Sequence, residues 1–142
     1  MKQEEKDLLL KDLCGRLTYG VKVKFGDSKP APLTVIEHDE FGWRIGSEDE
    51  FGGMITIIDN VKPYLFPLSS MTEEQYNEMQ TISGKDCMEH MEIEKEWRNN
   101  SPFTHLPLYQ HRVIEFFHKY HFDYRGLIPM GLAINATGLN IY

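Results

Sequence analysis

The spacing of apolar residues changes along the chain, and each change predicts a different secondary structure. Near the start, leucines recur at three- and four-residue spacing, which predicts an amphipathic helix over residues 3–15 that ends at Gly15. From Tyr19 the period becomes two, so that a strand has one apolar and one charged side. Such segments, separated by turn sequences, predict strands at 19–25, 32–38, 42–47 and 53–58.

These short strands follow one another closely and are joined by tight turns, as in a β-meander. We therefore expect residues 18–70 to form a small curled antiparallel sheet or an SH3-like barrel. Pro63 and Pro67 cannot donate hydrogen bonds to a neighbouring strand. The segment NVKPYLFPLSS is consequently expected to be an edge strand at most.

The helical period returns in the second half, which predicts a helical part at 72–121. Thr72 and Gln75 fit a capping box, and Met71 is expected to pack on Tyr76. The pattern over residues 81–104 is weak, although DCMEHMEIEKEWR is compatible with a helix. A longer helix is predicted at 106–121 from a stripe of apolar residues on one side. Ile114 and Phe116 widen this stripe, which consists of Leu106, Tyr109, Val113, Phe117 and Tyr120. A sheet followed by helices predicts a single α+β domain over residues 1–142.

The last segment, residues 122–142, carries no charged side chain after Arg125. An apolar tail in water favours aggregation, so we expect it to pack on the domain. In that arrangement Asp123 and Arg125 lie at a surface turn, where they pair with each other. The residues expected to be buried are Leu127, Ile128, Leu132 and Ile134. The alternative interpretation is that the tail is a partner-binding strand.

The charge of the chain argues against nucleic acid as a partner. The formal net charge is −7, from 22 acidic and 15 basic residues, and no basic stripe is visible. The apolar runs are too short for a membrane-spanning helix, and no signal peptide is recognised. Cys14 and Cys87 do not form a metal-type pair, which favours reduced thiols in the cytoplasm. Cys14 lies on the leucine-rich helix and is expected to be buried.

Three stretches resemble a known family. LKDLCGRLTYGVKVKF, VKPYLFPLSSMTEEQ and HKYHFDYRGLIPMGLAINATGLNIY resemble small proteins encoded in phages, prophages and mobile elements of gut Bacteroidales. No reaction is assigned to that family, so the resemblance transfers no catalytic residue. It implies a phage or prophage product that acts inside a bacterial cell. Residues 27–59 and 81–105 lie outside the resemblance.

The predicted helix 106–121 carries weak metal-ligand candidates. Glu115 and His118 form Glu-x-x-His, a spacing used in carboxylate-bridged metal centres, and His111 is expected on the same face. A second copy of the motif is missing, so we interpret these residues as a solvated face and expect no metal or cofactor. Neither cysteine has an activating neighbour in sequence, and no glycine-rich phosphate loop occurs, so no catalytic residue is assigned.

The aromatic residues on the predicted strands suggest a partner-binding surface. Small barrels bind peptides through aromatic grooves, although most strand aromatics belong to the core. The candidates are Trp43, Phe51 and Tyr64. Acidic turns at 37–40 and 48–50 would border such a groove and favour a basic partner.

The hypothesis that follows is a non-enzymatic accessory protein that contacts an unknown protein partner. One alternative is a metal-binding protein or metal-dependent enzyme that uses His111, Glu115 and His118. Another is an acidic mimic of nucleic acid that blocks a host DNA-binding protein. Formation of a homo-oligomer is left open.

Overall fold

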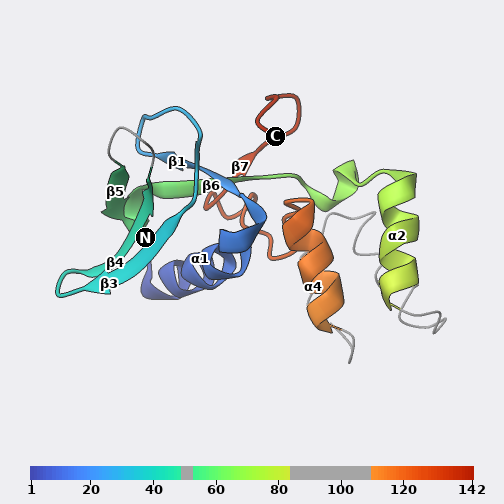
Figure 1. Cartoon of the computed structure of the whole chain (residues 1–142), viewed down its shortest axis with the longest axis horizontal. Helices are drawn as coiled ribbons and strands as arrows, with labels where there is room; N and C mark the ends of the chain where they lie inside the picture. Colours follow the sequence, from blue (N-terminus) through green and yellow to red (C-terminus); the bar gives the residue numbers. More distant parts are fainter. Residues whose placement is uncertain (49–52, 84–109) are drawn as a thin grey trace.

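The structure, a computed structural model of the chain, describes residues 1–48, 53–83 and 110–142. Within these residues lie an N-terminal helix, two small sheets and two further α-helices (Figure 1). The predicted α+β class is therefore confirmed.

The N-terminal helix α1 spans Gln3–Arg16 and buries one face against the sheets. Leu9 and Leu13 are fully buried on this face, at the spacing that predicted the helix. The helix start is capped by Glu5, whose carboxylate accepts a hydrogen bond of 2.8 Å from the backbone N–H of Lys2.

Gly15 allows close packing, and the helix ends one residue later than predicted. The helix continues to Arg16 and is followed by a 3₁₀ turn, η1 (Leu17–Tyr19). A Cβ atom on Gly15 would lie 2.5 Å from Cε1 of His118, so the glycine lets α1 approach the helix α4 (Gln110–Lys119). The chain reverses at Gly20, whose φ of 68° lies in the left-handed region.

A four-stranded sheet with the order β2–β1–β6–β7 lies in the middle of the molecule (Figure 1). Strand β1 alternates as predicted, with Val23 and Phe25 buried and Lys22 and Lys24 partly exposed. It pairs antiparallel with β2 and β6, whereas β7 pairs parallel with β6. The strands are β1 Lys22–Phe25, β2 Ala31–Pro32, β6 Val61–Leu65 and β7 Ile134–Asn135.

A three-stranded antiparallel sheet has the order β3–β4–β5. The described strands of 18–70 thus form an unclosed sheet arrangement, and the SH3-like barrel is not formed. The predicted strands at 42–47 and 53–58 correspond to β4 and β5, while the prediction at 32–38 divides into β2 and β3. The bounds are β3 Val35–Asp39, β4 Gly42–Ser47 and β5 Met54–Ile57, after which a 3₁₀ turn, η2, spans Ile58–Asn60.

The prediction that the proline-containing segment forms an edge strand at most is wrong. Strand β6 lies between β1 and β7, and Pro63 is opposite Val23 of β1. The N–H of Gly26 donates to the carbonyl of Asn60, so the alternation of an antiparallel ladder makes Val23 and Pro63 a pair without backbone hydrogen bonds. The missing N–H of Pro63 therefore removes no bond to β1.

Two helices form the other side of the molecule. Helix α2 (Glu73–Ser83) begins with the predicted capping box, because Thr72 N–H donates to Gln75 Oε1 and Gln75 N–H donates to Thr72 Oγ1. A 3₁₀ turn, η3 (Leu68–Ser70), leads into it. Helix α4 packs against α2, and Glu78 accepts hydrogen bonds from Lys119 and Tyr120. The predictions for residues 84–109 lie outside the described residues.

The buried apolar residues form two clusters. The first lies between α1 and the sheets, and the second joins α2 and α4 to the segment that follows α4. Met71 is buried in the second cluster, against which Tyr76 packs. Of the predicted stripe on α4, Val113 and Phe117 are buried and Tyr120 is partly buried.

The C-terminal segment packs back on the domain. Leu127 and Leu132 are buried as predicted, whereas Ile128 and Ile134 are only partly buried. Asp123 does not lie at the surface. Its carboxylate accepts hydrogen bonds from the N–H groups of Leu127 and Ile128, and it is buried. The tail thus continues the first core cluster.

Candidate functional site

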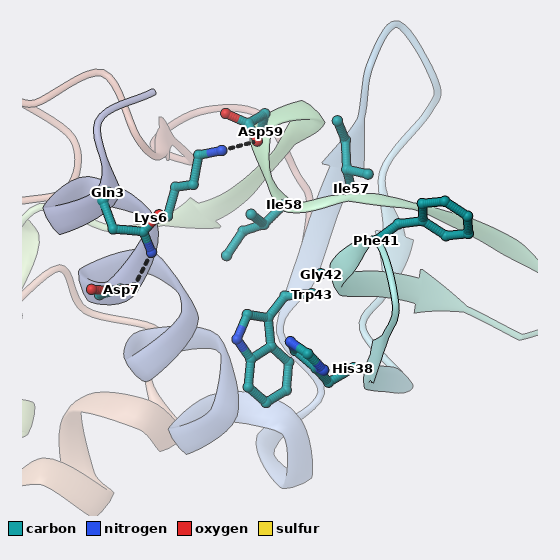
Figure 2. A pocket seen from close by; sticks show the side chains of 10 residues that line it. All are labelled: Gln3, Lys6, Asp7, His38, Phe41, Gly42, Trp43, Ile57, Ile58 and Asp59. Carbon is teal, nitrogen blue, oxygen red and sulfur yellow. Dashed lines mark hydrogen bonds and ion pairs between the residues drawn. The ribbon is translucent and has the colours of Figure 1, made fainter.

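A pocket of about 470 Å³ opens between the start of α1 and the hairpin formed by β3 and β4 (Figure 2). Its volume lies within the range of small-molecule sites. Helix α1, the hairpin and the η2 turn each contribute part of the wall. The lining residues are Gln3, Lys6, Asp7, His38, Phe41, Gly42, Trp43, Ile57, Ile58 and Asp59.

The hairpin turn sets the aromatic side of the pocket. The carboxylate of Asp39 accepts a hydrogen bond of 2.8 Å from the N–H of Phe41, and Gly42 supplies a φ of 112° that L-residues rarely adopt. The hairpin register places His38 opposite Trp43. Their rings meet edge to face with a centroid distance of 5.0 Å.

The polar side of the pocket is formed by Lys6, Asp7 and Asp59. Lys6 Nζ lies 2.6 Å from Asp59 Oδ2, and this hydrogen bond from Lys6 lowers the pKa of Asp59. Asp7 is exposed and accepts a hydrogen bond of 2.7 Å from the neutral amide of Gln3. The N-terminal ammonium group of Met1 also lies 3.4 Å from Asp59 Oδ1, so Asp59 pairs with two cations, whereas Asp7 pairs with a neutral amide. Figure 2 shows the contacts of Lys6 and Gln3 across the pocket from Trp43 and His38.

The arrangement suits the binding of a cationic side chain. Trp43 keeps 40% of its surface exposed, so a face or edge of the indole is open to solvent. An aromatic ring attracts a cation within about 6 Å of its centroid, and a nearby carboxylate adds to that attraction.

The predicted partner-binding residues do not converge. Trp43 lines the pocket, but Tyr64 lies on β6 in the other sheet and is 7% exposed. The carbonyl of Tyr64 accepts a hydrogen bond from the hydroxyl of Tyr142. Phe51 lies outside the described residues. The sequence prediction missed His38, which the hairpin register places opposite Trp43, and Asp7, whose place in the lining depends on how α1 packs against the hairpin.

The three residues predicted as weak metal-ligand candidates lie in different environments. His111 and Glu115 are exposed on α4, whereas His118 is buried. His118 Nε2 lies 3.1 Å from the hydroxyl of Tyr124, and burial together with the charge of Arg16 lowers its pKa to about 4. The interpretation of His118 as part of a solvated face is therefore wrong. Among the described residues, no three His, Cys, Asp or Glu side chains gather in metal-binding geometry.

Sequence reasoning missed a buried polar network between α1 and the segment after α4. Arg16 donates to both carboxylate oxygens of Asp12, at 2.6 and 3.2 Å, and both residues are fully buried. Arg16 also donates to the carbonyls of Phe117 and Phe122, at 3.4 and 2.7 Å. The available signal was a charged pair at i, i+4 on the leucine face of α1.

Two further predictions about single residues need correction. Arg125 pairs with Asp12, at 3.3 Å from Nε to Oδ1, and does not pair with Asp123. Cys14 is exposed, because it lies on the face of α1 opposite Leu9 and Leu13. Partial desolvation raises the pKa of the Cys14 thiol, which disfavours the reactive thiolate.

In the described part of the chain, no helix has the length and apolar character needed to span a bilayer. Comparisons of the chain with protein-family models, curated proteins and solved structures found no match.

Proposed function

We propose that this chain is a non-enzymatic accessory protein that acts by contacting another protein. The pocket at Trp43 receives a basic side chain of that partner. The observation that carries this proposal is the exposed indole of Trp43, which lies across the pocket from Asp7 and Asp59. The formal net charge of −7 attracts a basic partner over a longer range.

The biological setting of the proposal comes from the sequence resemblance. The three stretches that resemble phage and prophage proteins support a product of a mobile element that acts in the bacterial cytoplasm. The stretches cover residues 10–25, 61–75 and 118–142, so none of them contains a residue that lines the pocket, and the resemblance supports the setting but not the site.

A matched pair of peptides tests the proposal. The probes are Gly-Gly-Arg-Gly-Gly and the same peptide with citrulline, which replaces the guanidinium by a neutral group of similar shape. The protein carries Trp97→Phe, so that Trp43 is its only tryptophan. We expect the arginine peptide at millimolar concentration to shift the indole N–H resonance of Trp43, and we expect added salt to weaken the effect.

Two variants show whether the pocket is responsible. Asp7→Asn is expected to reduce the peptide-induced shift, because it removes a carboxylate from the lining. Met130→Ala changes an exposed apolar residue outside the pocket lining and is expected to leave the shift unchanged. An equal response to arginine and citrulline, or no response to either, contradicts the proposal.

A further inference from the structure

The outer edge of β5 is open in the part of the chain that the structure describes. Strand β5 pairs with β4 on one side, and no described strand pairs with its other side. Figure 1 shows β5 at the end of the molecule away from α2 and α4. Natural edge strands are protected by charged residues, proline or bulges, but Met54–Ile57 contains no charge and no proline.

The backbone groups on this edge are set by the pairing within the sheet. The carbonyl of Gly46 accepts a hydrogen bond from Thr34, so the backbone of Gly46 points toward β3. Gly46 is opposite Ile55 across β4 and β5, so this pair has no backbone hydrogen bonds. The N–H and C=O groups of Ile55, and of Ile57 two residues later, consequently point away from β4 toward the open edge.

The side chains of the same two residues form an apolar surface. Ile55 and Ile57 are each 43% exposed and lie on one face of the sheet. Gly46 lies between Val35 and Ile55, and a Cβ atom there would lie 2.8 Å from Ile55 Cγ1 and 3.4 Å from Val35 Cβ. The glycine thus lets the two apolar side chains approach each other and extends the surface inward.

We propose that this edge is a homodimer interface in which β5 pairs antiparallel with β5 of a second copy, about a two-fold axis at Thr56. In that register Ile55 of each copy lies opposite Ile57 of the other, so the outward backbone groups meet as hydrogen-bonded pairs. The four isoleucines then form cross-strand apolar pairs on a single face. The two three-stranded sheets become one six-stranded sheet.

Charge supports a second copy as the occupant. The paired segment is uncharged, so two acidic chains meet there without placing like charges opposite each other. Arg44, which is opposite Ile57 in the pairing of β4 with β5, forms an ion pair with Asp39. The edge therefore gives a basic segment no electrostatic advantage, in contrast to the pocket at Trp43. Ile57 belongs to both surfaces, because it also lines that pocket, but pairing of β5 does not require that the pocket be occupied.

The short pairing limits the affinity. Stable interfaces bury roughly 1,200–2,000 Å² in total, which a strand of this length does not provide alone. We therefore expect the dissociation constant of the dimer to lie above about 10 μM. Sedimentation equilibrium from about 10 μM to about 1 mM should show a monomer that converts to a dimer.

The double variant Ile55→Lys/Ile57→Lys tests the interface. It places four lysines together in the dimer, so the variant is expected to remain monomeric throughout the concentration range. Met130→Lys/Leu139→Lys is the matched control, because it adds the same charge at two other exposed apolar positions and should dimerise. Circular dichroism confirms that both variants remain folded. A monomeric wild-type protein at every concentration, or a dimer that persists in the β5 variant, overturns the proposal.

Cysteine cross-linking tests the register in a Cys14→Ser/Cys87→Ser background. Thr56→Cys faces its own copy across the axis in a closely spaced pair, where a disulfide fits. Ile57→Cys faces Ile55 of the second copy, so it is the matched control and should form far less cross-linked dimer. Equal cross-linking of the two variants, or preferential cross-linking of Ile57→Cys, overturns the proposed register.

Discussion

Asp12 and Arg16 form a fully buried ion pair on the apolar face of α1, where charged residues are rare. The pair is accommodated because each polar group has several partners. Asp12 also contacts Arg125, and Arg16 donates to two carbonyl groups of the segment around the end of α4. A buried charge with these partners specifies how two elements meet, since removal of one partner leaves the other charge uncompensated.

We expect Asp12→Asn to lower the free energy of unfolding by about 3–5 kcal/mol, because Arg16 then remains buried without its counter-ion. The matched control is Lys119→Met, which removes an exposed ion pair with Glu78 and should cost about 1 kcal/mol or less. Urea denaturation of both variants measures the two costs. If Asp12→Asn lowered the free energy of unfolding as little as Lys119→Met does, the contact of Asp12 with Arg16 would not stabilise the fold.

His118 should make stability depend on pH. Burial and the charge of Arg16 lower its pKa to about 4, whereas the unfolded chain keeps a value of about 6.5. Between these values the unfolded state binds more protons, so the free energy of unfolding falls as the pH falls. The decrease approaches about 1.4 kcal/mol per pH unit for this residue.

Urea midpoints at several pH values between about 5 and about 6.5 test this slope in the wild type and in His118→Gln. The variant should show a shallower dependence, because glutamine keeps a polar contact with Tyr124 but does not titrate. Subtraction of the two curves removes the shared contributions of His121, whose pKa is also about 4, and of Asp123, whose pKa is raised by burial. Identical slopes would contradict the assignment.

At the scale of elements, local patterns predicted what depends on local physics. Val23 and Phe25 alternate with lysines, and Thr72 and Gln75 cap α2, so these elements were readable from a few residues. The central position of β6 in the sheet could not be predicted from its local sequence. Its central place depends on β7, which follows it by about 70 residues and pairs with it only after the chain has folded back.

The site was predictable only in part for the same reason. The exposed Trp43 on a strand indicated one wall of the pocket. The α1 residues of the opposite wall are distant from Trp43 in sequence, so their proximity could not be predicted from local patterns. His118 was assigned to the wrong face because helical periodicity cannot show that α1 also packs against α4. That second contact depends on Gly15.

Gly15→Ala therefore tests how closely the two helices approach. In an isolated helix this change stabilises by about 1 kcal/mol, but here the added methyl group would lie against the buried His118 ring. We expect a net loss of about 1–2 kcal/mol in the free energy of unfolding. Cys14→Ala changes the preceding, exposed residue and should stay within about 0.5 kcal/mol of the wild type. A stabilising effect of Gly15→Ala would show that the helices are not in close contact there.

At the scale of the whole molecule, the C-terminal segment joins the two core clusters. Phe122 and Tyr124 belong to the cluster around α4, whereas Leu127 and Leu132 belong to the cluster under the sheets. The backbone follows the same path, because Phe66 exchanges hydrogen bonds with His121 and Asp123, and β7 pairs with β6 further on. The segment thus couples the two halves of the described structure.

Deletion of residues 126–142 should consequently destabilise the whole fold. Each buried apolar side chain in the segment contributes roughly 1.5–3 kcal/mol, and a domain of this size is stable by only about 5–15 kcal/mol. We expect insoluble protein or a sharply lower melting temperature. Leu127→Ala gives a graded test, because it should cost about 2–5 kcal/mol yet leave a measurable transition. Leu139→Ala, at an exposed position of the same segment, should be nearly neutral. If the truncated chain kept the wild-type melting temperature, the tail would not belong to the core, and its apolar residues would be better explained as a surface for a partner.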